Sequence, residues 1–80
     1  MPLELHGSLT EDVETFKDQD IPLNSSFISS CYYDAQNQTL YLRMQGGEYT
    51  LVGVPPDEFI GLISASSPGQ YFNSVLKGKY

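Results

Sequence analysis

The sequence predicts a small α+β domain in which an antiparallel sheet comes first and helices follow. Between residues 27 and 52, apolar and β-branched side chains alternate with the period of two that is typical of strands. After Pro55 and Pro56 the apolar residues recur at the three- and four-residue spacing of helices. Because 80 residues suffice for one hydrophobic core, we expect a single domain.

The first 23 residues differ in charge from the rest of the chain. They carry six acidic residues against one lysine, whereas residues 24–80 carry four against three basic residues. Leu3–His6 alternates like a strand, and Ser8 and Glu11 have capping-box spacing for a short helix. We therefore expect an acidic extension over residues 1–23, docked on its own domain or on a partner, and a compact domain over residues 24–80.

Three strands are predicted next, over Phe27–Tyr33, Thr39–Met44 and Glu48–Val52. A polar loop over residues 34–38 separates the first two, and the glycine pair at 46–47 provides the positive φ angles of a tight second turn. The result is an antiparallel meander. In its second strand Leu40 and Leu42 share one face and point into the core, while Tyr41 and Arg43 face outward or toward a partner.

Two short helices are expected after the sheet. The first covers Asp57–Ala65, with acidic residues in its first turn. The second begins after Ser67, because Ser67 can cap it, Pro68 fits its first position and Gln70 has capping-box spacing. Gly78 ends this helix.

Composition narrows the class of protein. No apolar run approaches the roughly 20 residues of a membrane span, and the start of the chain lacks the pattern of a signal peptide, so we expect a cytoplasmic protein. With Cys31 as the single cysteine, neither a disulfide framework nor a cysteine-based zinc site is expected. A net charge of −6 argues against a long nucleic-acid footprint.

Several separated motifs together resemble the KTSC domain. They are Ser25 to Asp34, Leu40-Tyr41-Leu42, Gly47-Glu48-Tyr49, Val54-Pro55, Phe59, Leu62, Ala65, Ser67, Gly69, Tyr71-Phe72-Asn73 and Lys77 up to Tyr80. The resemblance covers about residues 24–80. This family takes its name from a domain at the C-terminus of some lysyl-tRNA synthetases, and it also occurs as free-standing small bacterial and phage proteins.

The resemblance implies a fold more strongly than a function. The synthetase association suggests RNA binding for the family. The family's Tyr-x-Tyr motif stands here as Tyr49-Thr50-Leu51, so the second aromatic residue is missing.

We expect no catalysis, no cofactor and no metal site. A nucleophile and base pair needs both groups within hydrogen-bond reach, and the single histidine, His6, and the single thiol, Cys31, lie in different segments. The acidic pairs at 11–12 and 57–58 are not expected to bind a metal cation, because the side chains of adjacent helical residues point in different directions and no loop has EF-hand spacing. Both pairs are instead typical of solvated helix starts.

Binding is the function that the aromatic content favours. Six tyrosines without a tryptophan combine apolar faces with polar tips. The candidate ligand-binding residues are Tyr41, Arg43, Ser67, Gly69, Tyr71, Asn73, Lys77, Lys79 and Tyr80. We expect a non-catalytic module that holds a protein partner or a small anionic, nucleotide-like ligand and that self-associates through its remaining aromatic surface. RNA binding, disfavoured by the net charge, is the alternative.

Overall fold

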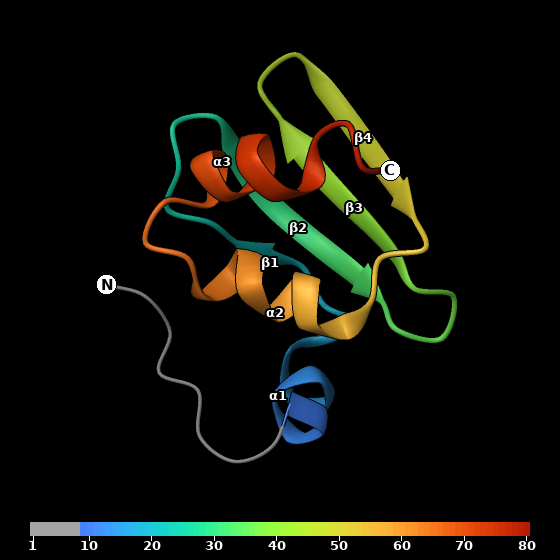
Figure 1. Cartoon of the computed structure of the whole chain (residues 1–80). Coiled ribbons are helices and arrows are strands. Elements are labelled where there is room, and N and C mark those ends of the chain that lie inside the picture. Colours follow the sequence, from blue (N-terminus) through green and yellow to red (C-terminus); the bar gives the residue numbers. More distant parts are fainter. Residues whose placement is uncertain (1–8) are drawn as a thin grey trace.

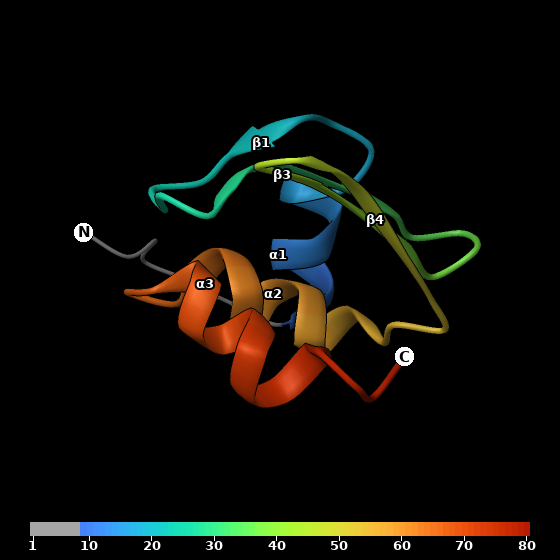
Figure 2. The ribbon, with the colours of Figure 1, turned by 90° about the horizontal axis from the view of Figure 1, so that it is seen from above.

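The computed structural model describes the backbone of residues 9–80 and the side chains of residues 13–80. Four strands, β1 (Ile21–Pro22), β2 (Ile28–Asp34), β3 (Thr39–Met44) and β4 (Gly47–Val52), form one antiparallel sheet in the order β1-β2-β3-β4. The helical elements are α1 (Leu9–Phe16), α2 (Pro56–Ser64), α3 (Pro68–Tyr71) and the π-helical turn η1 (Phe72–Leu76). Figures 1 and 2 show α2 and α3 on one side of the curved sheet. The α+β fold class predicted from the sequence is thereby confirmed.

The sheet has one strand more than the sequence predicts. The additional strand, β1, pairs with β2 so that Ile21 lies opposite Cys31, and the amide of Leu23 donates to the carbonyl of Ser29 over 3.0 Å. A two-residue strand carries no periodicity of its own, so only its long-range partner reveals it. The strand predicted at residues 3–6 lies outside the described residues.

The second predicted helix is divided into two short elements. Ser67 caps α3 as expected, because its hydroxyl oxygen accepts the amide of Gln70 over 3.4 Å. The chain then continues as η1, which is wider than an α-helix. Its last hydrogen bond is the five-residue contact in which the amide of Lys77 donates to the carbonyl of Phe72 over 2.7 Å. Gly78, with φ +85°, comes directly after Lys77, the residue that caps the end of η1.

The core lies between the sheet and the helices. Tyr33 of β2 stacks on Phe59 of α2 with ring centroids 4.4 Å apart and planes inclined by 12°. The hydroxyl of Tyr33 donates to the carbonyl of Val54 over 2.6 Å, so this buried polar group is paired. Leu40 and Leu42 are fully buried on the same side of the sheet, as the alternation in β3 predicts.

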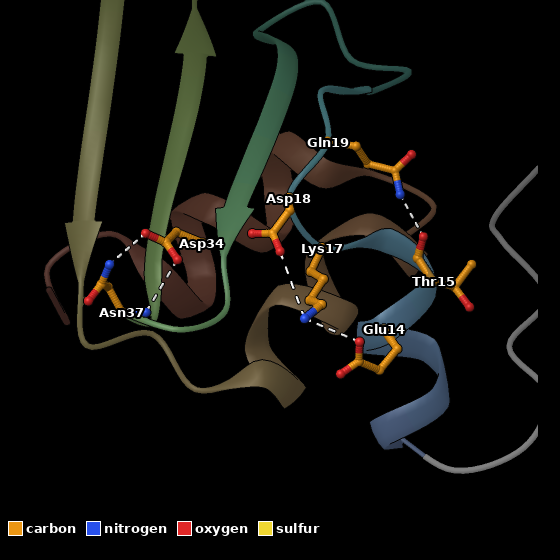
Figure 3. A network of polar contacts seen from close by, with 7 residues as sticks. All are labelled: Glu14, Thr15, Lys17, Asp18, Gln19, Asp34 and Asn37. Atoms are coloured by element: carbon orange, nitrogen blue, oxygen red, sulfur yellow. Dashed lines mark hydrogen bonds and ion pairs between the residues drawn. The ribbon is translucent and has the colours of Figure 1, made fainter.

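The described part of the acidic segment, from Leu9 onward, docks on its own domain. Val13 of α1 is buried in the core, and α1 packs against α2. After the helix, Asp18 takes a positive φ of 57° and its amide donates to the carbonyl of Tyr33 over 2.9 Å. Figure 3 shows Lys17 between Glu14 and Asp18, with nitrogen–oxygen distances of 3.2 and 3.8 Å. Of the two docking alternatives, the described part of the chain shows the intramolecular one.

Candidate binding groove

Two of the sequence-predicted site residues lie on the face of the sheet that α2 and α3 leave open. Tyr41 of β3 is 41 % exposed and its ring contacts that of Tyr32, with centroids 6.2 Å apart. On the same strand, the guanidinium of Arg43 lies 3.7 Å from the carboxylate of Glu48. Both therefore face outward, as expected, but Arg43 already has an acidic neighbour.

Ser67 and Tyr71 line a depression of about 330 Å³ beside α3. Tyr71 covers Gly61 so closely that a Cβ at that glycine would overlap with the Tyr71 hydroxyl. Gly69 is buried and faces Phe27 rather than solvent. No basic residue is among those lining this depression, so it offers no charge for an anion.

Lys79 and Tyr80 converge on one helix residue. The ammonium group of Lys79 and the hydroxyl of Tyr80 both donate to the carboxylate of Glu58 in the first turn of α2. These hydrogen bonds lower the pKa of Glu58, and burial together with the Glu58 contact raises the pKa of Tyr80 to about 12. The pair thus tethers the end of the chain to α2.

A groove of about 330 Å³ between the β3–β4 turn and η1 combines aromatic rings with a cation. We call it the aromatic groove; it is lined by Phe27, Met44, Gln45, Gly46, Gly47, Glu48, Tyr49, Phe72 and Lys77. Phe72 is 2 % exposed and forms its buried base. The more exposed rings of Phe27 and Tyr49 flank it, with centroids 6.1 and 5.6 Å from that of Phe72.

The charge balance of the aromatic groove is locally positive. Lys77 is exposed, and among residues 13–80 no acidic side chain forms an ion pair with it. The one acidic residue of the groove, Glu48, has Arg43 as its neighbour at 3.7 Å, which offsets its charge. The groove therefore presents one uncompensated cation beside aromatic surface.

The turn at the mouth of the groove exposes its backbone. Gly46 and Gly47 have φ angles of 95° and 149°, and nothing lies within 4 Å of where their Cβ atoms would be. Glycine is the residue that adopts this conformation without strain and lets a ligand approach the main chain. The turn predicted from these glycines is present, and it borders the groove.

The aromatic groove differs from the predicted set of site residues. Of that set, Lys77 alone lines it, whereas Asn73 is exposed on η1 and lines neither cavity. Phe27 and Tyr49 were absent from the prediction because they lie far apart in the sequence. Position 49 did carry a signal, since it is the aromatic residue retained from the family motif. Leu51, at the motif's second aromatic position, is buried.

The candidate residues for nucleophilic or metal chemistry are Cys31, His6 and the acidic side chains. Burial raises the pKa of the Cys31 thiol to about 12, so the nucleophilic thiolate does not form near neutral pH. Among the residues described, no cluster of three or more His, Cys, Asp or Glu side chains suits a metal ion. His6 lies outside them. Within residues 9–80 no helix has the length and apolar character needed to cross a membrane.

The fold defines the class of protein: it is a small α+β domain whose antiparallel sheet is covered on one face by helices. Residues 24–80 match the model of the KTSC domain, and the chain belongs to this family. The predicted resemblance is thereby confirmed.

Proteins from three bacteria are similar to this chain. The chain is similar to the crystal structure of a KTSC domain protein from Yersinia pestis, with a TM-score of 0.73 and 39 % identity over 76 % of this chain and 87 % of that one. A protein of Tsukamurella paurometabola is 38 % identical over 60 residues, 74 % of this chain and 90 % of the relative. An uncharacterized protein of Stutzerimonas stutzeri is 34 % identical over 61 residues, 75 % of this chain and 86 % of the relative.

Proposed function

We propose that this domain is a non-catalytic binding module that holds a small aromatic anion, such as a mononucleotide, in the aromatic groove. The observation that carries the proposal is the position of Lys77, a cation without an acidic partner among residues 13–80, beside the rings of Tyr49 and Phe27. A base stacks on aromatic side chains, and a nearby ammonium group attracts a phosphate.

The dimensions favour a small ligand over a polymer. A volume of about 330 Å³ is at the lower end for ligand pockets and suits one base with its sugar and phosphate. A polynucleotide instead needs a continuous row of cations, and the chain carries only four basic residues against ten acidic ones. Three of these four, Lys17, Arg43 and Lys79, lie beside carboxylates, at 3.2, 3.7 and 2.5 Å.

The proposal is tested by titrating the purified chain with adenosine monophosphate and guanosine monophosphate and following amide shifts by NMR. We expect the shifts to concentrate at the β3–β4 turn and η1. Stacking on one aromatic side chain contributes about 1–3 kcal/mol, so Tyr49→Ala should weaken binding by roughly 5- to 150-fold. The variant Lys77→Gln should remove the preference for a nucleotide over the corresponding nucleoside.

Matched controls outside the groove are Tyr41→Ala and Lys79→Gln, which delete the same side-chain types elsewhere. Each should leave binding unchanged, and circular dichroism should show that all four variants remain folded. Shifts scattered over the surface, or equal losses in groove and control variants, would overturn the groove as the site. Tighter binding of an RNA oligonucleotide with a steep salt dependence would replace the proposal with the RNA alternative.

A further inference from the structure

The two edges of the sheet are built differently. The β1 edge is two residues long and ends in Pro22, which has no amide hydrogen to donate. The β4 edge is six residues long, and among the described strands β4 pairs with β3 alone. In Figure 1 no described segment runs along the outer side of β4. One edge is therefore closed to further pairing, and the other is open.

The open edge lacks the usual protection against pairing. Strand β4, with the sequence Gly-Glu-Tyr-Thr-Leu-Val, contains no proline or lysine. Its single charge, on Glu48, is offset by Arg43 of the neighbouring strand, 3.7 Å away. Val52 at its end is 70 % exposed. An uncovered strand with these features is a template for another strand.

We propose that the β4 edge is the interface at which a second copy of this chain pairs, strand β4 against strand β4, in the antiparallel direction. This inference is independent of the aromatic groove, because pairing uses the outward backbone groups of β4 and no ligand. It joins two four-stranded sheets into one continuous sheet.

Strand geometry and charge select the arrangement. Opposed residues of an antiparallel pair share a face of the sheet, so a two-fold axis at Thr50 places Glu48 opposite Val52 of the second copy. The two Glu48 carboxylates then lie about 13 Å apart along the strands, beyond the screening length of about 10 Å at 0.1 M salt. A parallel pair in register would instead place the two acidic side chains side by side. The edge is thus complementary to itself in the antiparallel direction.

The same arrangement continues an existing row of side chains. Tyr32, Tyr41 and Thr50 lie opposite one another across β2, β3 and β4 on the open face. With the axis at Thr50, this row extends into the second copy and ends at its Tyr32. The two tyrosines contact each other in each copy, so the open faces of both copies merge into one aromatic surface.

Sedimentation velocity over a concentration series, at low and high ionic strength, measures the association. We expect a dimer that tightens as salt rises, because each copy carries a net charge of −6 that must be screened. Amide hydrogen exchange of β4 should slow as the concentration increases, while the β1 edge should not change. A chain that stays monomeric at roughly millimolar concentration in both salts would overturn the proposal.

A pair of charge variants at one exposed position tests the register. Val52→Glu brings a carboxylate opposite Glu48 at two symmetric places in the dimer and should weaken it roughly 2- to 30-fold. Val52→Lys brings an ammonium group to the same place and should keep or tighten it. Gln36→Glu, in the exposed β2–β3 loop, adds the same charge outside strand β4 and should leave association unchanged.

The outcomes separate the proposal from its competitors. If Val52→Glu and Gln36→Glu weaken association equally, overall charge explains the effect and the β4 edge is overturned as the interface. If Val52→Lys weakens the dimer as much as Val52→Glu, the antiparallel register is overturned. A monomer that protects its β4 amides only after an extended peptide is added would assign the edge to a different partner.

Discussion

The two faces of the sheet both carry tyrosines, but those on one face are buried in the core and those on the other are exposed. Tyr33 and Tyr32 are neighbours in β2, yet Tyr33 is fully buried against Phe59 whereas Tyr32 is 37 % exposed and contacts Tyr41. The difference follows from the pleat, which directs successive side chains to opposite faces. Aromatic content alone therefore does not separate core from surface in this protein; the position relative to the helices does.

The largest difference between the faces should appear when an aromatic ring is removed. Phe59→Ala leaves a cavity beside Tyr33 in the core, and we expect the free energy of unfolding to fall by about 3–5 kcal/mol. Tyr41→Ala, on the open face, should lower it by less than about 1 kcal/mol. Urea denaturation followed by circular dichroism measures both changes.

An equal loss in these two variants would contradict the division into a structural and a surface face. If Tyr41→Ala proves the more costly substitution in dilute protein, the open face has a packing role that the monomer does not show. Repeating the measurement over a range of concentrations distinguishes that role from dimer dissociation.

A smaller effect is expected when only a hydroxyl group is removed. Tyr33→Phe deletes the donor to the Val54 carbonyl and leaves that acceptor buried without its partner, so we expect a loss of about 1–3 kcal/mol in the free energy of unfolding. Tyr32→Phe is the matched variant, since its hydroxyl is on the open face, and it should change stability by no more than about 0.5 kcal/mol. Thermal or urea unfolding of the two variants side by side is the measurement. A loss of equal size in both would show that the buried hydrogen bond adds nothing specific.

The smallest expected effect is the pH dependence of stability that comes from the contact of Glu58 with Lys79 and Tyr80. The pKa of Glu58 is lowered from its ordinary value of 4.5 by the hydrogen bonds from Lys79 and Tyr80. A carboxyl group with a lowered pKa in the folded state stabilises the fold fully above its unfolded pKa, and this contribution disappears as pH falls through the folded pKa. We therefore expect a slight fall in the melting temperature of the wild type below about pH 4.5.

Glu58→Gln provides the control for the pH profile. Asp34, whose pKa is also lowered, by its hydrogen bonds with Asn37, titrates in the same range and remains in the variant. The difference between the two melting profiles therefore reports Glu58 alone, and it should be present above pH 4.5 and vanish in acid. A constant difference at every pH would show that the carboxylate charge is not what holds the end of the chain.

Local pattern accounts for most of the fold. Strand β3 begins and ends where the sequence predicts, and the predicted starts and ends of β2, β4 and α2 lie within one residue of those observed. In each case the period of the apolar residues and a proline, glycine or polar loop mark the element. Strand β1 was missed because two residues have no period, and η1 was missed because the same apolar stripe fits an α-helix.

The candidate site could be predicted only in part. The sequence predicts Lys77 as a binding residue near the end of the last helix, and Lys77 does line the aromatic groove. The sequence does not single out Phe27 and Tyr49, because the segment before β2 and strand β4 meet at η1 only in the folded chain. Six of the other predicted residues are distributed over the open face, the α3 depression and the Glu58 contact, whereas Gly69 is buried against Phe27 and Asn73 is exposed on η1.

The sequence by itself determined the α+β class, the central meander and the inward face of Leu40 and Leu42, because these depend on residue period and turn chemistry over short stretches of chain. It also determined the family, through separated motifs that occur in a fixed order. Only the tertiary structure decided that β1 joins the sheet, that α1 docks through Val13 and that no described strand pairs with the outer edge of β4. Those features depend on contacts between residues distant in the chain, and local preferences do not encode which partner a short segment meets.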